Sequence, residues 1–160
     1  MTTVKQFGLV GKNIDYSFSK KYFSEKFEKE NLDNCSYQNF DIHSVFVITQ
    51  IIKNPNLAGL NVTIPYKEEI IPFLDKISKK AKKIGAVNTI KITKKGKLKG
   101  YNTDFYGFQK SLNSLLNENH KKALILGTGG ASKAVAFALK KLEIQFTFVS
   151  QKDSKEYLSY

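Results

Sequence analysis

The stretch Leu57-Ala58-Gly59-Leu60-Asn61-Val62-Thr63-Ile64-Pro65-Tyr66-Lys67 decides how the first part of the chain is organised. Its apolar first half predicts a strand that ends near Thr63. Pro65 lacks the N–H that a strand ladder needs and favours the first position of a helix, so we expect a helix there with Lys67 in its first turn. Asn61, Thr63 and Lys67 would then converge on one small polar ligand. The alternative is that the first two cap the turn and Lys67 is solvated.

Length and composition predict a globular chain. Its 160 residues are 41% hydrophobic and 12% aromatic, which is enough for a core and fits about one domain. No apolar run approaches the ~20 residues of a membrane span, and the first thirty residues do not resemble a signal peptide, so we expect no membrane partner. The single cysteine, Cys35, cannot form a disulfide within the chain, which favours the cytoplasm.

The formal net charge of +12 would ordinarily suggest a nucleic-acid partner. However, all 26 cationic residues are lysine, and arginine, which supplies the bidentate fork for guanine edges and phosphates, is absent from the sequence. Two lysine clusters, within residues 79–83 and 94–99, are typical of solvated faces. We therefore expect a small-molecule ligand, with neither a nucleic-acid partner nor a metal site.

Two serines stand before the first predicted helix. A strand is expected over residues 4–10, and apolar spacing predicts a helix over about 20–32. Ser17 or Ser19 would cap this helix. Because a helix N-terminus also offers backbone N–H groups and a positive dipole end, the two hydroxyls could equally bind a carboxylate there.

The next elements indicate a mixed sheet covered by helices on both faces. A strand is expected over 36–42, a helix over 44–53, and a lysine-rich helical segment ending at Gly85. Residues 86–92 and 97–103 should pair as a hairpin through a turn at Gly96. The second hairpin strand ends in Gly100-Tyr101-Asn102-Thr103-Asp104, and a helix follows at once, so Asp104 lies at or next to its cap.

Beyond residue 120 the pattern changes to a short strand, a glycine turn Gly127-Thr128-Gly129-Gly130-Ala131-Ser132, a helix over 131–142 and a strand over 144–149. This is the dinucleotide-binding fingerprint in its expected context. No carboxylate follows the second strand until Asp153, which favours NADP over NAD. Because parallel strands are normally covered on both faces, we expect this unit to expose four apolar side chains, at Leu124, Leu126, Phe146 and Phe148.

Five elements together resemble the shikimate dehydrogenase family. They are Ser-x-Ser at Ser17, Asn-Val-Thr-x-Pro-x-Lys at Asn61, Gly-Ala-Val-Asn-Thr at Gly85, Gly-x-Asn-Thr-Asp at Gly100, and the glycine turn at Gly127. The resemblance implies an α/β fold. It comprises a substrate-binding domain with a mixed sheet over residues 1–119, then the first β-α-β unit of a Rossmann domain, incomplete, over residues 120–160.

The resemblance also implies an activity, the NADPH-dependent reversible reduction of 3-dehydroshikimate to shikimate on the route to chorismate and the aromatic amino acids. Lys67 and Asp104 would form the catalytic acid–base pair, and Ser17 and Ser19 would contact the substrate carboxylate. The ring hydroxyls would be contacted by Thr63, Lys67, Asn88 and Asp104. The cofactor would be held by Gly127, Thr128, Gly129, Gly130, Ala131, Ser132, Ser150 and Gln151.

Three departures from the family pattern leave alternatives open. Tyr16 and Lys20 stand where the family often has histidine and proline around the two serines. Gln151 stands where the family usually has an arginine for the 2′-phosphate, so NAD is possible as well as NADP. Only about two strands of the dinucleotide domain are expected before Tyr160. The alternatives are a truncated, non-catalytic small-molecule-binding fragment and a quinate/shikimate dehydrogenase relative.

Overall fold

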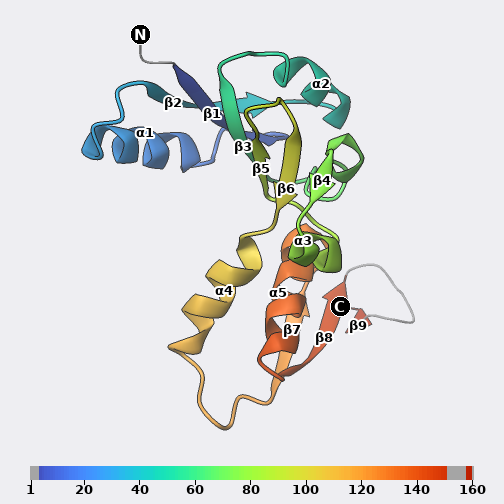
Figure 1. Ribbon diagram of the computed structural model, residues 1–160. Helices are drawn as coiled ribbons and strands as arrows, with labels where there is room; N and C mark the ends of the chain where they lie inside the picture. Colours follow the sequence, from blue (N-terminus) through green and yellow to red (C-terminus); the bar gives the residue numbers. More distant parts are fainter. Residues whose placement is uncertain (1–3, 151–157, 160) are drawn as a thin grey trace. The chain divides into compact units, whose positions relative to one another are not determined.

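The computed structural model describes residues 4–150 and the backbone of residues 158 and 159. The chain forms two compact units (Figure 1). Of the described residues, those up to Ser78 together with Val87–Tyr101 belong to the first unit, and Lys79–Ala86 with the residues from Asn102 onward belong to the second. The expected domain division between residues 119 and 120 stays a prediction.

The first unit contains a six-stranded mixed sheet in the order β2-β1-β3-β5-β6-β4. Its strands are β1 Lys5–Gly11, β2 Cys35–Asp41, β3 Leu57–Val62, β4 Lys76–Ile77, β5 Thr89–Ile92 and β6 Leu98–Tyr101. β1 runs parallel to both β2 and β3, whereas β5 is antiparallel to β3 and to β6. The predicted mixed sheet and the hairpin of β5 and β6 are therefore confirmed.

One face of the sheet is covered over β1 and β2 by helix α1, Ser19–Lys29. Phe23 and Phe27, one helical turn apart, pack against the cluster of Leu9, Ile14 and Tyr37. The rings of Phe23 and Tyr37 stack, with centroids 4.6 Å apart and planes at 14°. This stacking fixes a helix side chain against a strand side chain and anchors α1 on the sheet.

The opposite face of the sheet carries the main core of the first unit. Because side chains alternate along a strand, Val10, Leu60 and Ile90 lie on this face, and each is at most 3% exposed. The segment predicted as one helix over 44–53 is divided into a 3₁₀ turn, η1 Val45–Val47, and a short helix, α2 Ile48–Ile51. The fully buried Ile48 shows that this segment contributes to the core.

The expectation of a helix that begins at Pro65 is wrong. Residues 64–70 form consecutive turns and are followed by a 3₁₀ turn, η2 Ile71–Phe73; the Ile64–Pro65 peptide bond is cis. Pro72 lies only seven residues after Pro65 and cannot donate the N–H that a continuing α-helix requires. Local turn hydrogen bonds take the place of a helix between the two prolines.

The second unit combines three helices with a parallel sheet in the order β7-β8-β9. Its elements are α3 Lys79–Ile84, α4 Asp104–Asn113, β7 Lys122–Leu126, α5 Gly130–Lys141, β8 Gln145–Ser150 and β9 Leu158–Ser159. Phe105 of α4 meets Phe137 of α5 edge to face, with ring centroids 5.2 Å apart. The strand, glycine turn, helix and strand predicted from the sequence are confirmed.

Two of the four apolar side chains that we expected to be exposed in the second unit are exposed. Leu124 and Leu126 are 66% and 75% exposed on the face of β7 that α5 does not cover. Phe146 and Phe148 are instead half-buried, because they pair with the α5-facing residues of β7 and pack in the cluster around Ile125. The expectation for these two phenylalanines was therefore wrong, since their register places them beneath α5.

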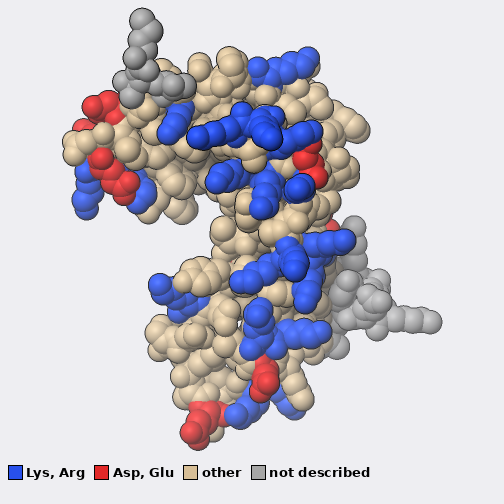
Figure 2. All heavy atoms as spheres, in the orientation of Figure 1, with Lys and Arg blue, Asp and Glu red and all other residues tan. Residues whose placement is uncertain are grey.

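Lysine side chains occur on both units on the face shown in Figure 2. Among the described residues, the longest apolar helical stretch falls short of what a membrane crossing requires.

We expect the packing at Ile90 to dominate the stability of the first unit. Ile90 is 1% exposed at the centre of the sheet, so Ile90→Ala should lower the free energy of unfolding by about 2–5 kcal/mol. The neighbouring exposed Lys91 provides the control, since Lys91→Ala should change it by less than about 0.5 kcal/mol. Urea unfolding followed by circular dichroism measures both, and equal losses would contradict this account of the core.

Candidate functional site

The first unit gathers polar residues at one edge of its sheet. The carboxyl ends of the parallel strands β1 and β3 meet there, and the antiparallel strand β5 begins there, because Asn61 pairs with Leu9 on one side and Thr89 on the other. The segments after β1, after β3 and before β5 therefore emerge at the same edge. These segments carry five of the residues singled out in the sequence: Ser17, Ser19, Thr63, Lys67 and Asn88.

Ser17 lies between β1 and α1, and Ser19 is the first residue of α1. Ser17 Oγ accepts a hydrogen bond from the N–H of Ser19 at 3.3 Å, so Ser17 satisfies one N–H at the start of the helix, whereas the N-cap position is Phe18. The hydroxyl oxygens of the two serines are 3.2 Å apart. Two adjacent, half-buried hydroxyls at a helix N-terminus suit an anionic oxygen, and capping does not use all of their hydrogen-bonding capacity.

Thr63 is held against the end of β1. Its N–H donates to the carbonyl of Val10 at 2.9 Å. A Cβ at Gly11 would lie 2.5 Å from Thr63 Cγ2, so only glycine allows this close approach. The threonine is thereby fixed beside the segment that leads to Ser17.

Backbone hydrogen bonds join the segment of Lys67 to that of Asn88. The carbonyl of Asn88 accepts from the N–H of Val62 at 2.8 Å, and the carbonyl of Lys67 accepts from the N–H of Val87 at 2.7 Å. Lys67 is half-buried and Asn88 is 8% exposed. The Oδ1 atom of Asn88 also accepts from the Thr89 hydroxyl at 3.0 Å, which orients its amide. Two residues twenty-one positions apart in sequence thus share one rigid frame.

Tyr66 anchors the turn that presents Lys67. Its ring is 2% exposed, and its hydroxyl donates to the carbonyl of Ile42 at 2.7 Å. Burial raises the pKa of Tyr66, so the hydroxyl retains the proton that it donates. The backbone next to Lys67 is consequently fixed by a buried hydrogen bond rather than by the helix expected from the sequence.

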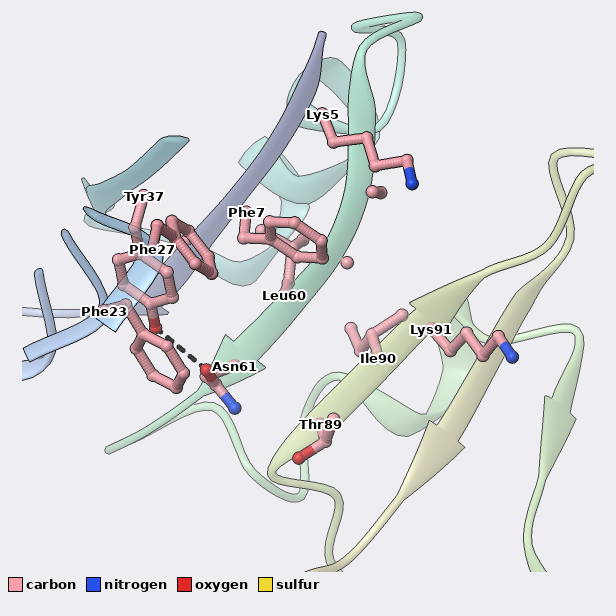
Figure 3. Close-up of a pocket in the computed structure, with 13 residues that line it drawn as sticks. Lys5, Phe7, Phe23, Phe27, Tyr37, Leu60, Asn61, Thr89, Ile90 and Lys91 are labelled. Carbon is pink, nitrogen blue, oxygen red and sulfur yellow. Dashed lines mark hydrogen bonds between the residues drawn. The ribbon is translucent and has the colours of Figure 1, made fainter. Parts of the chain in front are cut away.

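Sequence reasoning missed Tyr37. This residue of β2 lines an apolar cleft of about 470 Å³ on the α1 face of the sheet, together with Phe7, Phe23 and Asn61 (Figure 3). Its hydroxyl donates to Asn61 Oδ1 at 2.9 Å. The signal available in the sequence was only a tyrosine in a predicted strand, and the partner lies 24 positions away.

Asp104 is the first residue of α4 in the second unit, next to the helix cap as expected. The capping hydrogen bond belongs to Asn102, whose Oδ1 accepts from the N–H of Phe105 at 3.3 Å. Asn102 is 5% exposed and also donates to the carbonyl of Ala86 at 3.1 Å. The alternative in which Asp104 serves as the cap is therefore not needed to explain how the helix begins.

The glycine turn of the second unit has the geometry of an anion site. Gly127 has φ +101°, a conformation that disfavours other residues, and its N–H donates to the carbonyl of Val149 at 2.8 Å. α5 begins at Gly130, so its first N–H groups and positive dipole end face the turn. A Cβ on Gly129 would meet no atom within 4 Å, which leaves room for a ligand. These residues fit the phosphates of a dinucleotide.

The remaining cofactor residues lie along the same turn and at the end of β8. Thr128, Ala131 and Ser132 belong to the turn and to the first turn of α5, and Ser150 is the last residue of β8 and 9% exposed. Gln151 lies outside the described residues. The choice between NADP and NAD at that position therefore stays a prediction.

Comparison with known proteins identifies similar chains. The family model of the shikimate dehydrogenase substrate binding domain matches residues 9–90. The shikimate dehydrogenase (NADP(+)) of Caldanaerobacter subterraneus subsp. tengcongensis is 39% identical over 154 residues, covering 94% of this chain and 54% of that protein.

Solved structures agree. Shikimate dehydrogenase 1 from Peptoclostridium difficile has a TM-score of 0.87 at 36% identity, covering 98% of this chain and 61% of that one. Shikimate 5-dehydrogenase from Thermus thermophilus, solved with NADP(H) and shikimate, has a TM-score of 0.84 at 28% identity, covering 98% of this chain and 63% of that one. The chain thus spans between about half and two thirds of the length of these proteins.

We expect the glycine turn to tolerate a side chain at one glycine and not at the other. Gly127→Ala should lower the free energy of unfolding of the second unit by about 1–2 kcal/mol, because alanine is disfavoured at positive φ. Gly129→Ala should change it by less than about 0.5 kcal/mol, since its φ is −76° and its surroundings are open. Native-state hydrogen exchange at β7 and α5 measures both; equal effects would contradict the assigned backbone.

Proposed function

Because the chain belongs to the family of the shikimate dehydrogenase substrate binding domain, we propose that it provides the substrate site of an NADP-dependent shikimate dehydrogenase. The observation that carries the proposal is the gathering of Ser17, Ser19, Thr63, Lys67 and Asn88 at one edge of one sheet. Shikimate bears one carboxylate and three hydroxyls on a ring. Paired hydroxyls at a helix N-terminus, an amide and an ammonium are groups that can bind such a ligand by hydrogen bonds.

In the proposed reaction, Lys67 acts on the 3-keto oxygen of dehydroshikimate. The nicotinamide of NADPH would supply the hydride to the carbonyl carbon. Negative charge then develops on the oxygen, and the Lys67 ammonium stabilises it and transfers a proton to form the hydroxyl. The hydrogen bond from Val87 to the Lys67 carbonyl and the buried Tyr66 hold the lysine backbone in place, so little reorganisation is needed.

We assign Asp104 as the partner of Lys67 in acid–base catalysis. β6 ends at Tyr101, which pairs with Thr89 at the site edge, and Asp104 follows only three residues later. Asp104 would orient the ammonium and accept a hydrogen bond from the neighbouring ring hydroxyl.

The glycine turn would hold the cofactor phosphates through the N–H groups at the start of α5. Ser150, at the end of β8, stands where the adenosine ribose of a dinucleotide is bound in this fold. We assign NADP as the cofactor, in keeping with the absence of a carboxylate directly after β8.

The substrate assignment is tested by comparing the binding of shikimate and quinate. Shikimate should shift the NMR signals of the five edge residues in the 160-residue chain, and more strongly than quinate at equal concentration.

The role of Lys67 is tested in a chain that is joined to a complete dinucleotide-binding domain. There, Lys67→Ala should lower kcat by about 10²- to 10⁴-fold while shikimate binding remains measurable. Lys94→Ala, at the exposed hairpin tip, is the control. If Lys67→Ala turned over as fast as the control variant, the catalytic role of Lys67 would be contradicted.

The assignment of Asp104 is tested by removing its charge alone. Asp104→Asn keeps the shape of the side chain, and Asn102 still caps α4. The free energy of unfolding should therefore change by less than about 1 kcal/mol, the size of a helix-dipole contribution. We expect kcat to fall by about 10²- to 10⁴-fold in the same sample. A loss of stability without a loss of turnover would assign Asp104 a purely structural role.

A further inference from the structure

The cleft of the first unit contains a chain of contacts that leads from α1 to the candidate site. Phe23 of α1 stacks on Tyr37 of β2, and the Tyr37 hydroxyl donates to Asn61 Oδ1 at 2.9 Å. Asn61 lies near the end of β3, two residues before Thr63 of the candidate site. Figure 3 shows the Asn61 Nδ2 atom on the side of the amide that points away from Tyr37.

We propose that Tyr37 is a positioning residue that fixes the Asn61 amide with its amino group turned toward the ligand. The proposal rests on the proposed function, because it assigns the ligand partner of Asn61 as an oxygen acceptor of a hydroxylated ring carboxylate. An asparagine amide can present either an acceptor or two donors. With Oδ1 held by the Tyr37 hydroxyl, Asn61 presents donors.

Tyr37 itself is well fixed for this role. Its ring is 6% exposed, and the nearly parallel Phe23 ring limits its rotation. Burial raises the pKa of Tyr37 to about 12, so the hydroxyl keeps its proton throughout the neutral pH range. The direction of the hydrogen bond, from Tyr37 to Asn61, is therefore constant under conditions in which an enzyme would work.

A second amide, directly before the neighbouring strand β5, has the same arrangement. Asn88 Oδ1 accepts from the Thr89 hydroxyl at 3.0 Å, and Thr89 is the register partner of Asn61. In both asparagines a hydroxyl donor occupies the carbonyl oxygen. The Tyr37 hydroxyl thus orients the Asn61 amide in the same way as the Thr89 hydroxyl orients the amide of Asn88. Asn88 and Thr89 are neighbours in sequence, whereas Tyr37 and Asn61 lie on different strands.

The experiment is a double-mutant cycle on the 160-residue chain with shikimate as the probe. Tyr37→Phe keeps the stacked ring and removes only the hydroxyl. We expect it to weaken shikimate binding by about three- to tenfold, the worth of one hydrogen bond. In an Asn61→Ala background the same change should cost less than about twofold, because the group that Tyr37 orients is gone. Tyr22→Phe, whose side chain is largely exposed on α1, is the matched control.

The Asn61 side-chain amide provides a readout that does not depend on the ligand. In ¹⁵N-labelled protein, its NH₂ resonances should move in Tyr37→Phe and stay in place in Tyr22→Phe. Unmoved resonances, or equal losses of affinity in the two backgrounds, would overturn the positioning role. If the parent chain binds no shikimate, the proposed function fails and so does the ligand partner of Asn61. The amide resonances then still decide whether Tyr37 fixes Asn61.

Discussion

The antiparallel placement of β5 beside β3 is the constraint on which the candidate site depends. A further parallel strand in this place would begin at the far edge of the sheet, and its preceding segment would lie away from the ends of β1 and β3. Because β5 runs the other way, its preceding segment meets the segment that follows β3. The hydrogen bonds from Val62 to Asn88 and from Val87 to Lys67 are the direct result.

Buried hydrogen bonds then fix the side chains that this backbone arrangement brings together. The Tyr66 hydroxyl satisfies the carbonyl of Ile42, and Tyr37 satisfies one side of Asn61. Each contact joins segments 24 residues apart. A buried polar group without a partner is costly, so such pairs favour one arrangement of the site over its alternatives.

In the second unit, the proposed phosphate site is formed by backbone groups rather than by side chains. Gly127 supplies the positive φ of the turn, and α5 supplies the N–H groups. The same unit leaves Leu124 and Leu126 exposed on one face of β7. Phe146 and Phe148 are covered, since strand pairing places them under α5.

The sequence by itself determined what depends on neighbours along the chain. It predicted every strand except the two-residue strands β4 and β9, together with α1, the glycine turn, the start of α4 at Asp104 and the motifs that identify the family, because these rest on local periodicity, capping or φ preference. Tertiary structure decided the rest. The turns in place of a helix around Lys67, the cap provided by Asn102 and the pairing of Tyr37 with Asn61 depend on which distant segments meet. A single sequence does not reveal such meetings, because a buried hydrogen bond between residues 24 apart leaves no periodic signal in the chain.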